Sequence, residues 1–437
     1  MSDSIAPASP PPLLRRHIAA ATVGNALEFY DFITYAFFAI QIGHAFFPSH
    51  SAFASLMLSL AAFGAGFATR PLGAVVIGIY SDRVGRRPAM MLSFTLMGIA
   101  IVTIALIPSY ATIGIAAPIL AVLARMVQGF SLGGEVGPNT AYLLEAAKPL
   151  RRGLIVNWQG ASQGIAGTFA GVVGMLLSET LTPSGLDAYG WRIAFLIGAV
   201  TLPFGLMIRR ALPETLHRAE ENAVAQSRTG SLGEILHAHG RLIVLSLLVI
   251  VGATVGTYVT NYLTTYAENT LHLDPVTAFG ATVVNNGVGI FAVLLGGWLS
   301  DRYGRRWVMV LPNVLFLVLV VPVFTWMVAA HSALALLAGT AVLSLVGALG
   351  IGAFYPAFSE SLPKRIRGST FAIVYAATVS LFGGTTQLVV TWLIKATGSP
   401  LAPAWYLFAA TAAGTLAMFF MRESAPVKIA MEVSHVR

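Results

Sequence analysis

Twelve long apolar runs dominate the sequence and restrict the folds open to it. Each run supplies the roughly 20 residues that a helix needs to cross a bilayer core. Hydrophobic residues make up 56% of the chain and charged residues 10%, whereas about a quarter of an ordinary soluble domain is charged. We therefore expect an all-α membrane protein with twelve transmembrane helices. The runs cover residues 17–44, 53–80, 88–107, 112–145, 152–178, 191–211, 241–267, 276–299, 307–329, 333–359, 368–394 and 402–421.

The pattern inside these runs argues against two other interpretations. Strands of a membrane β-barrel alternate polar and apolar residues, whereas LIVLSLLVIVGA at 242–253 shows no alternation. Residues 1–16 form a short polar, proline-rich tail, and the run behind it is too long and too polar for a cleaved signal peptide. We expect the first helix to be retained.

The residue types present exclude several kinds of chemistry. The chain contains no cysteine, which removes disulfides, thiolate metal sites and cysteine nucleophiles. No Ser-His-Asp set, metal-spaced histidine cluster or phosphate-binding loop stands out, and all histidines fall in tails, loops or helix ends. We expect no catalytic residues, no metal and no cofactor, and hence not an enzyme.

The net charge of +8 is explained by where the basic residues lie. With a cytoplasmic N-terminus, nearly all loop lysines and arginines fall on the cytoplasmic side, and the opposite loops hold little more than Arg192 and Lys395. This is the positive-inside pattern. It predicts a multi-pass protein of the cytoplasmic (inner) membrane with both termini cytoplasmic, and it makes nucleic acid an improbable partner.

Two motifs occur twice, about half a chain apart. GIYSDRVGRR (78–87) is repeated as GGWLSDRYGRR (296–306), and the segment from Glu145 to Gly153 is echoed from Glu360 to Gly368. The repeats predict two pseudo-symmetric six-helix bundles. We expect a cytoplasmic N-terminal tail, a first bundle, a cytoplasmic linker, a second bundle and a cytoplasmic C-terminal tail, at residues 1–16, 17–211, 212–240, 241–421 and 422–437.

These loops resemble the Asp-Arg-x-Gly-Arg-Arg signature of the major facilitator superfamily, over essentially the whole chain. The resemblance implies a carrier whose substrate site lies between the halves near the midplane, with access alternating between the two sides. It also implies that the loop acids and arginines latch the cytoplasmic side; anchoring by positive charge alone is the alternative. The implied gate residues are Asp82, Arg83, Arg87, Asp301, Arg302 and Arg306.

Five ionisable side chains lie inside the predicted helices, all of them in the first half. An ionisable group within a bilayer is expensive and is by default a functional hypothesis. At similar depths the second half offers only neutral polar residues. We expect the first half to handle charge and protons and the second half to shape the pocket. The five are Glu28, Asp31, Arg70, Arg125 and Glu135.

The fourth helix has one polar face and one face of small residues. Arg125, Gln128, Glu135, Asn139 and Tyr142 fall within an arc of roughly 100° on a 3.6-residue helix. The glycines of the same segment fall on the other side, where they let a neighbouring helix approach closely. The polar face is predicted to line a transport pathway.

Helices one and five add further polar groups. Asn25, Glu28 and Asp31 share a face of helix one, and two carboxyl groups one turn apart resist ionising together. Gln159 and Gln163 share a face of helix five. A carboxyl pair whose protonation depends on a nearby cation is what proton coupling requires, since proton and substrate must each alter the affinity of the other.

These groups predict a carboxylate site. A guanidinium binds a carboxylate through two hydrogen bonds, so Arg125 is the expected anion anchor, although it could instead be paired permanently with an acid of helix one. Arg70 precedes Pro71 and could either satisfy freed carbonyls or serve function. Glu28, Asp31 and Glu135 are the expected proton path. The predicted substrate-binding residues are Arg125, Asn25, Gln128, Gln159, Gln163, Tyr262, Asn286 and Tyr375.

A narrower resemblance rests on the order of several motifs. GNALEFYDF (24–32), RPLG (70–73), RMVQGFSLGGE (125–135) and Trp191-Arg192 resemble the metabolite:proton symporter family, and WQGASQG (158–164) is most similar to its citrate and tricarballylate carriers. This implies import of a small organic anion, a di- or tricarboxylate of the citrate or tricarballylate type, together with protons. We expect the protein to work as a monomer in the lipid bilayer. The alternatives are carriers of 2-oxoglutarate, shikimate or proline/betaine, and a drug:proton antiporter.

Overall fold

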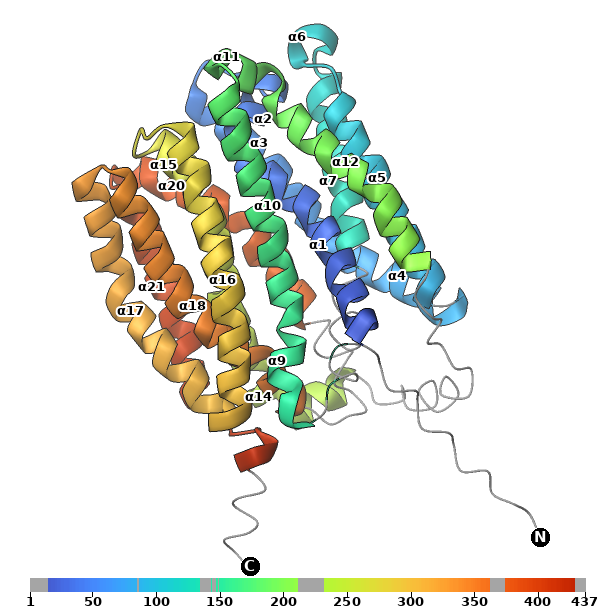
Figure 1. Cartoon of the computed structure of the whole chain (residues 1–437), viewed down its shortest axis with the longest axis vertical. Coiled ribbons are helices and arrows are strands. Elements are labelled where there is room, and N and C mark those ends of the chain that lie inside the picture. Colours follow the sequence, from blue (N-terminus) through green and yellow to red (C-terminus); the bar gives the residue numbers. More distant parts are fainter. Residues whose placement is uncertain are drawn as a thin grey trace, which may run out of the picture.

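The computed structural model describes residues 15–84, 86–133, 143, 147, 149–210, 232–361 and 374–428. These residues form helices joined by short turns, with no strand among them. The helices run side by side as a bundle, and the part of α1 that is described begins at the same end of the bundle at which α21 finishes (Figure 1). We call this the terminal end, and the other the far end.

The first half contributes six membrane-length rods, three of them interrupted. α1 and α2 form the first rod, α3 and α4 the second, and α9 and α10 the fifth. The backbone at Phe38 leaves the helical region and separates α1 from α2. The bounds are α1 Arg15–Phe37, α2 Ala39–Phe46, α3 Ala52–Ala68, α4 Arg70–Val84, α5 Arg86–Leu106, α7 Ala116–Gly133, α9 Arg152–Val156, α10 Trp158–Thr180 and α12 Trp191–Arg210. Short turns α6 (Tyr110–Ile113), η1 (Pro149–Arg151), α11 (Pro183–Gly185) and η2 (Leu186–Gly190) lie between them.

The second half repeats the arrangement. Asp274 caps the N-terminus of α16 by accepting a hydrogen bond from the Thr277 backbone N–H at 2.9 Å, with Pro275 as the first helical residue. The bounds are α14 Leu232–Asn261, α15 Leu263–Asn269, α16 Pro275–Tyr303, α17 Arg305–Ala330, α18 Ala333–Ser361, η3 Val379–Gly383, α20 Gly384–Thr397 and α21 Ala402–Phe419.

Eleven of the described segments are long and apolar enough to cross a membrane. The twelfth expected span is α1, which is helical but carries Asn25, Glu28 and Asp31 in its middle. Its low mean hydropathy therefore reflects buried polar groups, which are candidates for function.

Two predicted boundaries differ from the structure. The fourth span was expected over 112–145, but α6 ends at Ile113, Gly114 turns with a φ of +59°, and α7 begins only at Ala116. The predicted linker reached residue 240, whereas α14 already begins at Leu232. The rest of the predicted linker, and residues 134–142 of the fourth span, lie outside the described residues.

Helix pairs from opposite halves pack closely against each other. α10 packs against α16, and α3 packs against α20. A Cβ placed on Gly64 of α3 would lie 2.6 Å from the Gly384 carbonyl oxygen of α20. Small residues thus let backbones from opposite halves approach closely, as in other membrane helix pairs.

Small residues also join helix four to helix two. A Cβ on Gly129 would lie 1.5 Å from the Gly66 carbonyl oxygen, and one on Gly133 would lie 2.0 Å from the Arg70 carbonyl oxygen. The predicted packing face of the fourth helix is therefore present as far as Gly133, the last residue of α7. This contact brings Arg70 and Arg125 into one region of the first half.

Candidate functional site

A cavity of about 220 Å³ lies between the two halves. The first half contributes side chains from α1, α3 and α10, and the second half contributes α14, α16, α17, α18 and α21. No acidic or basic residue lines it among the residues that the structure describes. Its polar lining comes mainly from Gln163, Tyr258, Asn261, Asn285, Asn286, Asn313, Ser344 and Tyr355, and its aromatic lining from Phe29, Phe32, Phe63 and Phe354. The second half therefore supplies most of the neutral polar wall.

Arg125 lies behind the aromatic part of this wall. Its side chain is fully buried, and its guanidinium carbon lies 4.6 Å from the ring centre of Phe32, 4.5 Å from Tyr35 and 4.8 Å from Phe63. Nη1 donates a hydrogen bond of 2.6 Å to Gln128 Oε1. Nε and Nη2 have no hydrogen-bond partner in the described part of the chain. Ring faces only partly replace the hydration that a buried cation loses.

Arg70 occupies a similar environment beside it. This side chain is 5% exposed, and its guanidinium carbon lies 4.5 Å from the centre of the Phe32 ring and 4.0 Å from that of Phe67. Its Nε and Nη2 also lack a hydrogen-bond partner among the described residues. The structural explanation, in which Arg70 satisfies freed carbonyls, therefore does not account for these two atoms. Two guanidinium groups share one aromatic ring.

Tyr258 connects these arginines to the cavity from the second half. Its ring lies 5.2 Å from that of Phe67 and 6.3 Å from that of Phe63, edge-on in both cases. Tyr258 lies close enough to Arg70 for their side chains to interact electrostatically, and it also lines the cavity. A movement between the halves would therefore change the surroundings of Arg70 directly.

The two acids of α1 are buried but do not pair with Arg125. Glu28 and Asp31 are each 1% exposed, and neither forms an ion pair with Arg125 in this structure. Asp31 Oδ1 has no hydrogen-bond partner among the described residues, and it lies 1.8 Å from the position that a Cβ on Gly198 of α12 would occupy. Asp31 thus faces the sixth helix. The alternative of a permanent Arg125 pair with helix one is not found here.

The predicted amide ligands divide into two groups. Gln163 and Asn286 line the cavity. Asn25 instead donates to Ser162 Oγ at 2.6 Å and accepts from Gln159 Nε2 at 3.2 Å, which joins α1 to α10. Neither Asn25 nor Gln159 lines the cavity, so their role in this structure is to hold two helices of the first half together.

Three further predicted ligands lie behind the cavity wall. Gln128 binds Arg125, as described above. Tyr262 accepts a hydrogen bond of 2.9 Å from Thr391 of α20 and is fully enclosed. The ring of Tyr375 lies 6.4 Å from that of the cavity-lining Tyr355. Glu135 lies outside the described residues.

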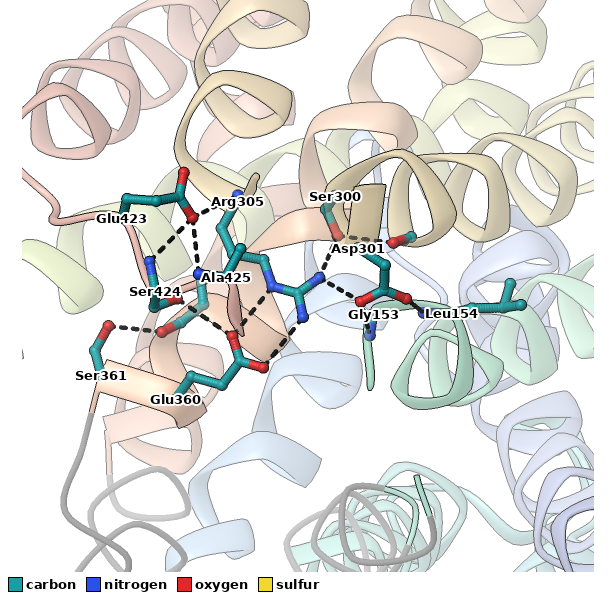
Figure 2. A network of polar contacts seen from close by, with 12 residues as sticks. Gly153, Leu154, Ser300, Asp301, Arg305, Glu360, Ser361, Glu423, Ser424 and Ala425 are labelled. Atoms are coloured by element: carbon teal, nitrogen blue, oxygen red, sulfur yellow. Dashed lines mark hydrogen bonds and ion pairs between the residues drawn. The ribbon is translucent and has the colours of Figure 1, made fainter. Parts of the chain in front are cut away.

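The second repeated motif forms a network that joins the halves at the terminal end (Figure 2). Asp301, near the end of α16, accepts hydrogen bonds from the backbone N–H groups of Gly153 (2.8 Å) and Leu154 (3.0 Å), at the start of α9. The first N–H groups of a helix lack partners within the helix and carry partial positive charge. A carboxylate from the second half thus caps the fifth helix of the first half.

Arg305 holds this carboxylate in place (Figure 2). Nη1 donates to Asp301 Oδ1 at 2.7 Å, while Nε and Nη2 each donate at 3.1 Å to the two oxygens of Glu360 in α18. The arginine side chain is fully buried, and its two acidic partners are nearly so. A bidentate pair and a second acid satisfy a cation that would be costly to bury alone.

The segment after α21 adds further hydrogen bonds to this network. Glu423 accepts hydrogen bonds from the backbone N–H groups of Arg305 (2.8 Å) and Arg306 (3.1 Å), and Ser424 Oγ donates to Glu360 at 3.3 Å. Gly304, with a φ of +104°, makes the turn that exposes these N–H groups. The start of α17 is therefore capped by the segment that follows α21.

Among the predicted gate residues whose side chains the structure describes, Asp301 joins the two halves at the terminal end, whereas Arg302 and Arg306 do not. Arg302 lies over Trp298 at 5.8 Å and Arg306 donates to the Phe419 carbonyl at 2.7 Å, so neither binds Asp301 in this structure. The sequence interpretation missed Arg305, although its spacing of four residues from Asp301 on an adjoining helix was visible. The side chains of Asp82, Arg83 and Arg87 lie outside what the structure describes.

These features identify the class of protein to which the chain belongs. Two helical halves, a cavity between them and a polar contact joining them at one end form the architecture of an alternating-access carrier. The profile of the Major Facilitator Superfamily matches residues 21–292 and 277–430, and the chain belongs to this superfamily. It is accordingly a multi-pass membrane transporter, as its fold and its resemblances predicted.

The chain is also similar to several individual proteins. The chain is 36% identical to a citrate-proton symporter of Klebsiella pneumoniae, over 94% of this chain and 93% of that relative. It is 33% identical to a glycine betaine/proline/ectoine/pipecolic acid transporter of Dickeya dadantii (strain 3937), over 94% of this chain and 84% of that relative. The crystal structure of a D-xylose-proton symporter matches with a TM-score of 0.75 and 19% identity, over 94% of this chain and 98% of that one. The last comparison establishes the fold.

Proposed function

We propose that this protein imports a di- or tricarboxylate, of the citrate or tricarballylate type, together with protons. The observation that carries the proposal is the pair of buried guanidinium groups of Arg125 and Arg70, each with two nitrogen atoms that lack a partner in the described part of the chain. The likeness to a citrate-proton symporter supports the same substrate class.

Two neighbouring buried cations favour a substrate with more than one negative group. Each guanidinium binds a carboxylate through a pair of charge-assisted hydrogen bonds, and a dianion or trianion offsets both charges at once. A zwitterion has only one carboxylate and would add a third positive charge beside them. Arg125 is the primary anchor in this proposal, and Arg70 is the second.

Phe32 and Phe63 separate the cavity from Arg125, so substrate binding must move these rings. Both rings line the cavity on one side and contact the guanidinium of Arg125 on the other. Exchange of a ring face for a carboxylate replaces a weak cation–π contact with a stronger charged hydrogen bond. Substrate arrival is thereby coupled to a rearrangement of α1 and α3 side chains.

Glu28, Asp31 and Glu135 form the proposed proton path. A carboxyl group is far cheaper to hold in a low-dielectric interior when it is neutral than when it is ionised. Proton uptake by these acids and anion binding at the arginines therefore favour each other, which is the condition for symport. Glu135 enters this proposal from the sequence alone.

The Asp301 network serves as a latch on the cytoplasmic side in this proposal. The terminal end is placed in the cytoplasm because the basic loop residues gather there. Breaking the contact between Asp301 and α9 is then a required step in opening toward the cytoplasm. The protein acts in the cytoplasmic membrane of a bacterium, and one monomer contains a whole pathway.

A carrier of proline or betaine is the runner-up. It is favoured by the aromatic lining from Phe29, Phe32, Phe63 and Tyr258, which can bind a quaternary ammonium group, and by the likeness to the Dickeya transporter. The two buried arginines argue against it, because each has two nitrogen atoms without a partner in the described part of the chain and a cationic substrate group would lie close to both.

Substrate uptake into proteoliposomes tests the proposal. Labelled citrate, tricarballylate, 2-oxoglutarate and betaine are supplied with and without an imposed inward proton gradient. We expect citrate or tricarballylate to accumulate only with the gradient, and unlabelled tricarboxylate to compete better than betaine. Accumulation of betaine alone would establish the runner-up, and gradient-independent accumulation would refute proton coupling.

A further inference from the structure

A second contact between the halves lies at the far end, and it includes a carboxyl group that the proposed mechanism does not use. Figure 1 places α2 and α15 at this end. Gln41 of α2 donates a hydrogen bond from Nε2 to Oε2 of Glu268 in α15, at 3.4 Å. Phe38 and Phe279 pack nearby with their ring centres 4.9 Å apart. The far end is therefore closed by contacts from both halves.

The hydrogen bonding of Gln41 is incomplete. Its side chain is 3% exposed, and the buried Oε1 atom has no hydrogen-bond partner among the described residues. An unpartnered buried acceptor typically costs about 1–3 kcal/mol. An ionised Glu268 can only accept hydrogen bonds, so it offers nothing to Oε1. A neutral Glu268 has one O–H donor, which can complete the pair with the amide.

The groups around Glu268 also favour its neutral form. Asp187 of η2 and Asp274 at the start of α16 are the acids that act on it. His44 of α2 is engaged with Asp187, its Nδ1 lying 3.2 Å from Asp187 Oδ2. Tyr266, on the same helix as Glu268, donates instead to the Pro400 carbonyl. Lys395 of α20 lies over Phe53, 5.7 Å from the ring centre.

We propose that Glu268 is a proton-binding site of the external gate, and that its protonation closes the far end by completing a two-hydrogen-bond pair with Gln41. The inference uses the orientation given under the proposed function, in which the far end is external, but it does not depend on the identity of the substrate.

Burial raises the pKa of Glu268 from an ordinary value of 4.5 to about 7; the Gln41 hydrogen bond acts in the opposite direction, and Asp187 and Asp274 raise the pKa. In the open state the carboxyl is hydrated and has its ordinary pKa. Closing therefore takes up a proton. Closure is most favoured below about pH 4.5, and this advantage is lost as the pH rises through about 7, by at most about 300-fold in the closing equilibrium.

Spin-label distances across the far end test this directly, without substrate or transport. Because the chain has no cysteine, Ser49→Cys and Ala396→Cys place one label on each half, both at exposed positions. We expect the fraction of molecules with the short distance to fall as the pH rises from about 5 to about 8. In Glu268→Gln, whose amide pairs with Gln41 at every pH, this fraction should stay at its acid value.

Glu179→Gln is the matched control, because Glu179 is an exposed acid near the end of α10. It should keep the wild-type pH dependence. Gln41→Leu removes both the amide donor and the amide acceptor, so it should lower the short-distance fraction at acid pH. If Glu268→Gln keeps the wild-type pH dependence, or if the wild-type distance does not change with pH, the proposal is wrong. The thermal unfolding midpoint of each variant shows whether it is folded.

Discussion

Replacing Arg125 with alanine is expected to abolish binding and uptake of the carboxylate substrate. The substitution removes the guanidinium that the proposed anchor needs and leaves the substrate charge without its principal partner. Truncating one member of a buried, hydrogen-bonded charge pair costs about 2–5 kcal/mol, so the Kd should rise by about 30-fold or more. Calorimetric titration of the purified variant with citrate measures the change.

Two other variants separate recognition from general damage. Arg125→Lys keeps the charge but not the planar pair of donors, so it should bind more weakly than the wild type and more tightly than the alanine variant. Arg241→Ala removes an exposed arginine at the start of the membrane part of α14 and should leave the Kd unchanged. An unchanged Kd in folded Arg125→Ala would assign Arg125 to packing, and the carboxylate site would have to be elsewhere.

Replacing Arg305 with methionine is expected to release the latch and to destabilise the protein strongly. The change leaves Asp301 and Glu360 buried without the cation that binds both. Breaking a buried ion pair by removing one partner costs about 3–5 kcal/mol, and here two acids lose the same partner. The thermal unfolding midpoint should fall clearly, and uptake should be lost.

A milder substitution, at the carboxylate that contacts α9, tests the latch itself. Asp301→Asn keeps the shape of the side chain but removes the charge at the start of α9, so access from the cytoplasmic side should increase while most of the stability remains. Accessibility of a single cysteine introduced into the cavity wall, for example at Ala348, reports this opening. If Asp301→Asn leaves that accessibility unchanged, the contact with Gly153 and Leu154 is structural and does not gate the pathway.

The fold was predictable from the sequence because hydrocarbon requires helices with satisfied backbone groups. An apolar run of sufficient length predicts a transmembrane helix, and the repeated loop motif predicts two related halves. The breaks at Phe38 and Gly114 were not predictable in the same way, because each depends on backbone angles that the neighbouring helices impose.

The site was predictable in its chemistry more than in its contacts. Buried charges such as Arg125 and Asp31 stand out in an apolar run, whereas their surroundings depend on packing between distant helices. The sequence around Arg125 does not indicate that Phe63 packs against its guanidinium. Asn25 has a side chain suited to binding a substrate, but in this structure it donates a hydrogen bond that joins α1 to α10. Glu268 was overlooked because an acid just beyond a span normally lies in water.

If proton and carboxylate cross the membrane together, citrate entry must change the pH inside a vesicle. Citrate is added outside proteoliposomes that contain a pH-sensitive dye and no initial pH gradient. We expect the lumen to acidify as citrate enters, and we expect both acidification and entry to be lost in Arg125→Ala. Citrate entry without any acidification beyond that of protein-free liposomes would show that the protein does not couple citrate to protons.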